Sequence, residues 1–95
     1  MIPGLSLSSR VKIPPDVLFR HLQDELVVLA LKRGVYFGLD PIGARIWHLL
    51  GEERSLQDVL TNLVEEYEVE AAQGAEDVLG LVAELQAQGL LEIAD

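Results

Sequence analysis

The 95-residue chain has 16 acidic and 7 basic side chains, a net charge of −9, and no cysteine. This length fits one small domain with its own hydrophobic core, and without cysteine no disulfide, thiolate metal site or cysteine nucleophile is possible. No apolar run approaches the roughly 18 to 20 residues that span a bilayer, and the N-terminus lacks a secretion signal, so we expect a cytoplasmic protein without a membrane partner.

An uneven charge distribution divides the sequence. Residues 1–54 carry seven basic and six acidic groups, whereas residues 55–95 carry ten acidic groups and no lysine or arginine. An acidic surface repels a phosphate backbone. The C-terminal half is therefore unsuited to bind nucleic acid, and we expect no nucleic-acid partner.

The N-terminal residues 1–16 have weak hydrophobic periodicity and contain glycine, serine and proline. They predict an extended arm, which leaves residues 17–95 as the folded domain. Residues 17–21 alternate as a half-buried strand does, while residues 25–31 form a continuous apolar run that favours a strand covered on both faces or lying centrally. Residues 23–24 would form the turn between these two strands.

A third strand is predicted for the aromatic segment Val35-Tyr36-Phe37-Gly38-Leu39. The short polar loop before it ends in Gly34, which takes a positive φ at no steric cost and so favours a hairpin. A glycine inside a strand, here Gly38, marks either a bulge or the close approach of another backbone. The first half of the domain is thus predicted to be a three-stranded antiparallel meander.

Two helices are predicted next, each with a clear start. Asp40 is well placed as an N-cap with Pro41 at the first helical position, and the apolar periodicity that begins there ends at Gly51. Ser55 predicts the N-cap of the second helix, whose apolar stripe is broken after Tyr67.

A third helix is predicted at residues 72–88, with Gly89 as its C′ residue and a short strand or packed tail after it. Three strands followed by three helices make an α+β arrangement. The predicted fold is winged-helix-like, a three-stranded antiparallel sheet followed by a three-helix bundle.

The apolar face of the third helix is wide. At 100° per residue it covers about 160°, whereas a surface helix that faces one core needs ~100°. Either the whole face packs on the other helices, or part of it lines a groove whose opposite wall is the strand at residues 35–39. If that strand lies at the sheet edge, an extended peptide can add to it as a further antiparallel strand. The helix residues predicted to line the groove are Val78, Leu81, Val82 and Leu85.

A family resemblance rests on four consecutive features: the apolar strand at 26–31, the turn Lys32-Arg33-Gly34, the aromatic strand at 35–39 and the helix start at Asp40-Pro41. Together they resemble the PqqD family of small leader-peptide recognition domains, also called RiPP recognition elements, over residues 17–92. The resemblance implies that a leader peptide is clamped between the third strand and the third helix. Family members commonly carry Asn where this chain has Asp40, and both residues cap helices.

The resemblance also implies partners, and two subfamilies are candidates. In lasso-peptide systems the discrete leader-binding protein works with a cysteine protease, which removes the leader, and an ATP-dependent cyclase. In pyrroloquinoline quinone synthesis the domain is a peptide chaperone for a radical-SAM enzyme. A short stand-alone chain favours the lasso type.

Other classes of function fit the sequence less well. A winged-helix DNA-binding protein needs lysine and arginine on its recognition helix, but residues 55–95 contain neither. A constitutive structural subunit would bury its edge strand permanently in a large interface. An enzyme is not expected, because the sequence contains no phosphate-binding loop, pair of catalytic acids or nucleophile elbow.

No cofactor or metal is expected either. His21 and His48 lie in different predicted elements without an acidic residue at metal-ligand spacing, and the acidic residues 65–70 are typical of a solvated helix end. Trp47 is predicted to belong to the core.

Overall fold

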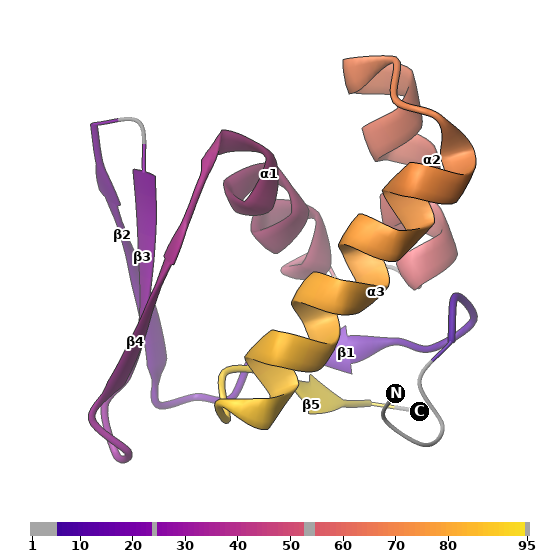
Figure 1. Cartoon of the computed structure of the whole chain (residues 1–95). Helices are drawn as coiled ribbons and strands as arrows, with labels where there is room; N and C mark the ends of the chain where they lie inside the picture. Colours follow the sequence, from indigo (N-terminus) through magenta and orange to yellow (C-terminus); the bar gives the residue numbers. More distant parts are fainter. Residues whose placement is uncertain (1–5, 24, 53–54, 95) are drawn as a thin grey trace.

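The computed structural model describes residues 6–23, 25–52 and 55–94 of the chain. Figure 1 shows a sheet of β2, β3 and β4 standing beside three helices. The elements are, in chain order, β1 (Val11–Lys12), β2 (Val17–Leu22), β3 (Glu25–Ala30), β4 (Val35–Leu39), α1 (Pro41–Leu50), α2 (Leu56–Tyr67), α3 (Ala71–Ala87) and β5 (Glu92–Ile93). The predicted α+β fold, three antiparallel strands followed by three helices, is confirmed.

The order of the main sheet is β2-β3-β4, and both outer strands pair antiparallel with β3. On β3 the side chains of Leu26, Val28 and Ala30 are buried and alternate with more exposed neighbours, as the pleat of a strand with one covered face requires. Gly38 lies directly opposite Val27 in a continuous register, so the bulge considered for this glycine is not formed.

Both hairpin turns use left-handed backbone. Gly34 has φ +66° in the turn before β4, as the sequence predicts, and Gln23 has φ +57° at the end of β2. Residue 24, the other half of the first predicted turn, lies outside the described residues.

Side-chain caps fix the starts of α1 and α2. The Asp40 carboxylate accepts a hydrogen bond from the Gly43 N–H at 2.7 Å, and the Ser55 hydroxyl accepts one from the Asp58 N–H at 3.2 Å. Both caps agree with the sequence prediction. Gly89 follows α3 with φ +78°, the left-handed conformation expected just after a helix.

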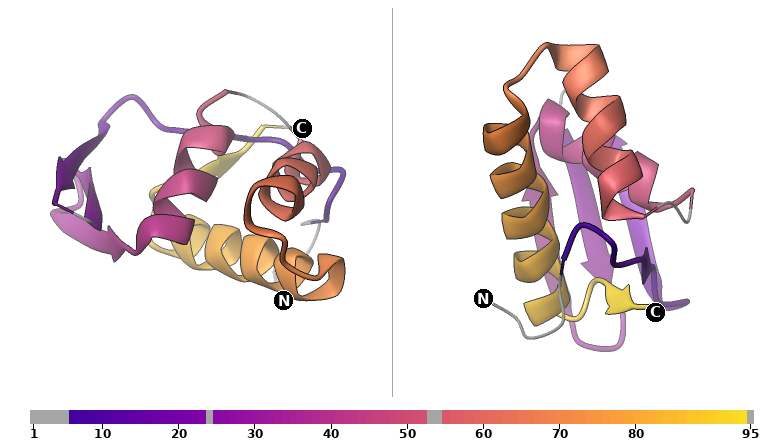
Figure 2. Two further views of the ribbon diagram at one scale, coloured as in Figure 1. Left: turned by 90° about the horizontal axis from the view of Figure 1, so that it is seen from above. Right: turned by 90° about the vertical axis from the view of Figure 1, so that its right-hand side faces the viewer.

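The described part of the predicted N-terminal arm packs on the helices. β1 pairs with β5 in a separate two-stranded sheet and does not join the main one, as Figure 2 shows. The carbonyls of Leu7 and Ser9 accept hydrogen bonds from the first two N–H groups of α2, which no residue within the helix can bind. Residues 1–5 of the arm lie outside the described residues.

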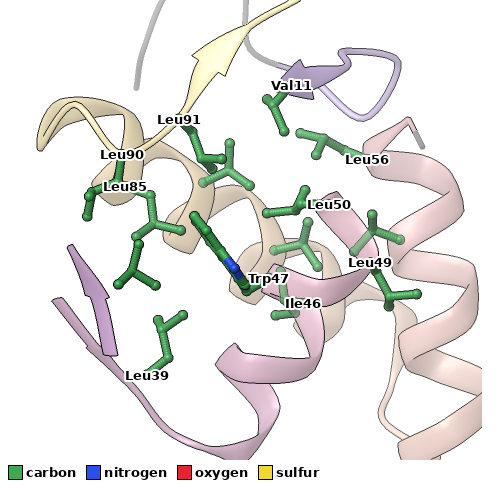
Figure 3. Close-up of a cluster of buried hydrophobic side chains, with 14 of the residues drawn as sticks. Val11, Leu39, Ile46, Trp47, Leu49, Leu50, Leu56, Leu85, Leu90 and Leu91 are labelled. Carbon is green, nitrogen blue, oxygen red and sulfur yellow. The ribbon is translucent and has the colours of Figure 1, made fainter. Parts of the chain in front are cut away.

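The core lies where α1 meets the sheet and the other helices. Figure 3 shows Trp47 of α1 in the middle of this cluster, 1% exposed, in agreement with its predicted place. Buried side chains reach it from the arm, from β4, from α2 and from the tail after α3. No helix in the described ranges combines the length and apolarity needed to cross a membrane.

Candidate functional site

β4 forms one edge of the main sheet. Within the described ranges β3 is the one strand that pairs with it, so the backbone groups on its other side face away from the sheet. Such an edge is a template for pairing with another chain. The segment carries no charged residue that would discourage a further strand.

A cavity of about 350 Å³ lies beside this edge, between β4, the start of α1 and the middle of α3. We call it the groove. Its lining residues are Phe37, Gly38, Leu39, Asp40, Ile42, Gly43, Ile46, Asp77 and Leu81. An extended segment added to β4 would therefore have an apolar depression next to it for its side chains.

Strand alternation determines what β4 presents to the groove. Leu39 is buried and Phe37 is half-buried against the core, while Tyr36 points outward and is 74% exposed. Gly38 adds no side chain, and a Cβ placed there would meet no other atom within 4 Å. Phe37, Gly38 and Leu39 thus line the groove, whereas Val35 and Tyr36 lie nearer the hairpin turn and outside its lining.

Gly43 lets α1 form the floor of the groove. A Cβ on this residue would lie 3.2 Å from the Asp40 carboxylate and 3.3 Å from a methyl group of Leu39. Those distances are tighter than ordinary carbon contacts. Glycine therefore lets the first turn of α1 lie close against the end of β4 without a shift of the Asp40 and Leu39 side chains.

The α3 wall differs from the sequence prediction. Val78, Val82 and Leu85 have no exposed surface and belong to the core, so they support the groove from beneath. Leu81 is half-buried and lines the groove, and Asp77, one turn earlier on the same face, lines it too. The sequence prediction considered only apolar residues of this helix and therefore missed Asp77. Asp77 lies four residues before Leu81, and this i, i+4 spacing places both side chains on the same face of the helix.

At the hairpin end of β4, one side chain of the turn reaches the end of α3. The Arg33 side chain of the β3–β4 turn lies against Gly89, where an added Cβ would come within 2.8 Å of the Arg33 Cδ. The guanidinium is thereby placed at the C-terminal end of α3, where a cation is favoured by the helix dipole. Asp77 lies towards the opposite end, beside α1.

Charge on the groove is acidic. Of the described residues, the charged ones that line it are Asp40 and Asp77, with no lysine or arginine among them. The nearby cation of α1, Arg45, instead forms a two-pronged ion pair with Glu66 of α2, at 2.6 and 2.8 Å. Hydrogen bonding in this pair raises the pKa of Arg45 and lowers the pKa of Glu66.

A second feature, away from the groove, joins β2 to α1. The Nε2 atoms of His21 and His48 lie 3.0 Å apart, closer than the 5.0 Å between their ring centres, so the nitrogens face each other. Phe19 packs edge-on against both rings. Burial, followed by the neighbouring His21 and Arg45, lowers the pKa of His48. Sequence spacing gave no signal for this pair, because 27 residues separate its members.

The face of the sheet turned away from the helices is apolar and largely uncovered. Leu18 and Leu22 of β2 are each about half exposed, and Tyr36 of β4, across β3 from them, is highly exposed. A shallow cavity of about 280 Å³ on β2 and β3 is lined by Leu18, Phe19, Arg20, Leu22, Val27 and Leu29. We call this surface the outer face.

Two solved structures are similar to this chain. One is described as "TbiB1 in Complex with the TbiA(beta) Leader Peptide"; it has a TM-score of 0.80 and 38% sequence identity, and the match covers 88% of this chain and 99% of that one. The other, "Lasso peptide synthetase B1 complexed with the leader peptide", has a TM-score of 0.79 and 28% identity over 87% of this chain and 98% of that one.

The family comparison agrees with the structural one. No curated protein sequence matches the chain. The model of the family described as "Coenzyme PQQ synthesis protein D (PqqD)" matches residues 25–91, which include the main strands β3 and β4 and all three helices. The resemblance drawn from the sequence is thereby confirmed, and the chain belongs to the PqqD family.

Proposed function

We propose that this protein binds the leader segment of a ribosomally made precursor peptide. The leader adds to the open edge of β4 as an antiparallel strand, and its apolar side chains enter the groove between β4 and α3. The observation that carries the proposal is that an unpaired strand edge and an apolar cavity lie side by side. Two similar structures described as leader-peptide complexes support it.

The energetics of such a complex are reasonable. Four to six backbone hydrogen bonds at about 0.5 to 1.5 kcal/mol each, with two or three buried anchors at roughly 1.5 to 3 kcal/mol each, give a gross gain on the order of 5 to 18 kcal/mol. Ordering the leader and restricting its motion consume a large share of this gain. A Kd of about 1 µM or somewhat lower is the expected result.

The favoured setting is lasso-peptide biosynthesis, because both similar structures carry that function or a leader complex in their descriptions. The family description keeps a peptide chaperone of coenzyme PQQ synthesis as the alternative. The partners would then be a leader protease and a cyclase in the first case and a radical-SAM enzyme in the second.

The protein assists these partners without catalysing a reaction itself. It raises the local concentration of the precursor at the enzyme, which is a tethering effect. Fusing the precursor to its processing enzyme by a linker long enough to reach the active site should therefore make the domain largely dispensable. An enzyme that still needed the free domain after fusion would contradict tethering and indicate activation.

The outer face is the surface on which a processing enzyme fits. Its half-exposed leucines, Leu18 and Leu22, flank the charged Arg20, and exposed apolar side chains gathered in this way mark protein contacts. It lies on the other side of the sheet from the groove's helical wall, so an enzyme bound there would leave the groove open. Leu18→Lys should then impair processing while leaving the Kd for the isolated leader unchanged.

Hydrogen exchange tests the binding mode directly. Addition of leader peptide should slow amide exchange in β4 and leave exchange in β2 unchanged, because the two strands lie at opposite edges of the sheet. A DNA duplex titrated at low salt is the control. Salt-sensitive binding of the duplex, with no peptide protection of β4, would support a winged-helix DNA binder instead.

A further inference from the structure

Within the described part of the chain, the groove is lined by acidic groups and by no basic ones. Among its lining residues are two carboxylates, those of Asp40 and Asp77, and seven residues that are apolar or glycine. The Asp40 carboxylate accepts the Gly43 N–H and lies at the N-terminus of α1, where the helix dipole favours a negative charge. It is therefore already stabilised within the chain.

Asp77 is in a different position. In the described residues its one hydrogen-bond partner is the neutral Gln73 amide, at 3.0 Å on the preceding turn. An ionised carboxylate accepts several hydrogen bonds, so this contact leaves most of its capacity free. The side chain is exposed and lies in the middle of α3, away from either end of the helix dipole.

Among the described residues that line the groove, no lysine or arginine accompanies this carboxylate. Residues 55–95 contain no lysine or arginine. Arg45 is held by Glu66, and Arg33 lies at the Gly89 end of α3, twelve residues or about 18 Å along the helix axis from Asp77. Glu84, two turns after Asp77 on the same face, adds further negative charge.

We propose that Asp77 selects leaders that carry a lysine or arginine beside their apolar anchors. This inference rests on the proposed function and names the chemistry of the peptide that the groove accepts. A carboxylate at the rim of an apolar groove pairs with a cation once the anchors are seated, and it repels a leader with an acidic residue there.

The strand direction predicts where that cation lies. β4 runs from the hairpin turn towards α1, and Asp77 is at the α1 end of the groove. A leader that pairs antiparallel with β4 places its N-terminal part at the same end. The basic residue should therefore precede the apolar anchors in the leader sequence.

Peptide selection on the intact protein tests this inference. A displayed library of random 15-residue peptides is selected on the wild-type chain, on Asp77→Lys and on Glu76→Lys. Glu76 is the matched control, because it is an exposed acid on α3 that does not line the groove. Wild type and Glu76→Lys should enrich lysine or arginine before the apolar anchors, and Asp77→Lys should enrich aspartate or glutamate at that same position.

Dissociation constants then measure the interaction between Asp77 and the basic residue of the peptide. For one enriched peptide, replacing its basic residue with glutamine should weaken binding to the wild type about threefold to tenfold, and should change binding to Asp77→Asn by less than about twofold. Enrichment of the same apolar peptides by wild type and Asp77→Lys, with no change in charge, would overturn the role of Asp77 and leave leader binding intact. Failure to enrich any peptide on the folded wild-type chain would overturn both proposals.

Discussion

The two edges of the main sheet are built differently, although both strands pair with β3. β2 contains the charged Arg20, and a charged residue on an edge strand discourages the addition of a further strand. β4 contains no charged residue and has a glycine that leaves room for an approaching backbone. The cavity at β4 also includes residues of α1 and α3, whereas the cavity at β2 is lined by sheet residues alone. An open strand edge becomes a specific peptide site when a helix supplies a second wall.

The largest expected effect comes from damaging that second wall. Leu81→Asp places a carboxylate in the groove without a partner, at a cost of about 2 to 3 kcal/mol, so the Kd for the leader should rise ~30- to 150-fold. Isothermal titration calorimetry with a synthetic leader peptide measures this Kd. Leu79→Asp is the matched control, because Leu79 is also a half-buried leucine of α3 but does not line the groove. A folded Leu81→Asp protein that binds normally would show that the leader uses another surface.

A moderate effect on stability is expected from a substitution at Gly43, in the floor of the groove. Gly43→Ala introduces a Cβ 3.2 Å from the Asp40 carboxylate and 3.3 Å from Leu39. The Asp40 carboxylate, which caps α1, and the Leu39 side chain must then shift by a few tenths of an ångström. This crowding should outweigh the gain in helix propensity and lower the free energy of unfolding by about 1 to 2 kcal/mol. Urea unfolding followed by the fluorescence of the buried Trp47 measures the change. An unchanged midpoint would mean that this contact does not hold the groove in shape.

The same substitution at another helical glycine should have the opposite sign. Gly80 lies within α3, and a Cβ there would meet no described atom within 4 Å beyond its chain neighbours and the nearby backbone of its own helix. Gly80→Ala should therefore raise the free energy of unfolding by roughly 0.5 to 1 kcal/mol, because alanine restricts the unfolded chain and favours the helix. Destabilisation in the same urea experiment would indicate a contact at this position that the structure does not contain.

The smallest expected effect concerns pH at the β2 edge. The pKa of His48 is lowered in the folded protein, chiefly by burial, from its ordinary value of 6.5. The unfolded chain then binds more protons, so this contribution to stability is complete above pH 6.5 and is lost as the pH falls through the folded pKa. Urea midpoints should decrease from pH 7.5 to 5.5. In His48→Gln that decrease should be smaller, and an equal decrease in both proteins would assign the pH effect to other groups.

Local patterns were sufficient to predict the elements. The caps at Asp40 and Ser55, the positive φ of Gly34 and Gly89, and the apolar periodicity of each helix involve residues within one or two turns of each other. Such signals need no knowledge of the rest of the chain. The same holds for the order of three strands followed by three helices, which supported the family resemblance.

The α3 wall shows where local patterns stop being sufficient. The apolar face of α3 spans about 160°, which is wider than a surface helix needs to cover one core. This pattern could not distinguish Leu81, which lines the groove, from three residues that are buried in the core: Val78, Val82 and Leu85. Only the position of α1 and α2 against the helix decides which of these side chains are sealed in the core and which one faces the groove. Burial is a property of the assembled layers, not of the helix.

The sequence by itself determined the secondary structure, the fold class, the uncharged β4 segment and the acidic C-terminal half. The tertiary structure alone decided which elements share a site: Asp77 and Leu81 of α3 face Leu39 of β4 in the groove, and His21 lies against His48 between β2 and α1. The physical reason is one of range. Hydrogen bonds of caps and turns, and helical or strand periodicity, join near neighbours in the chain, whereas a groove is formed by packing elements that lie tens of residues apart.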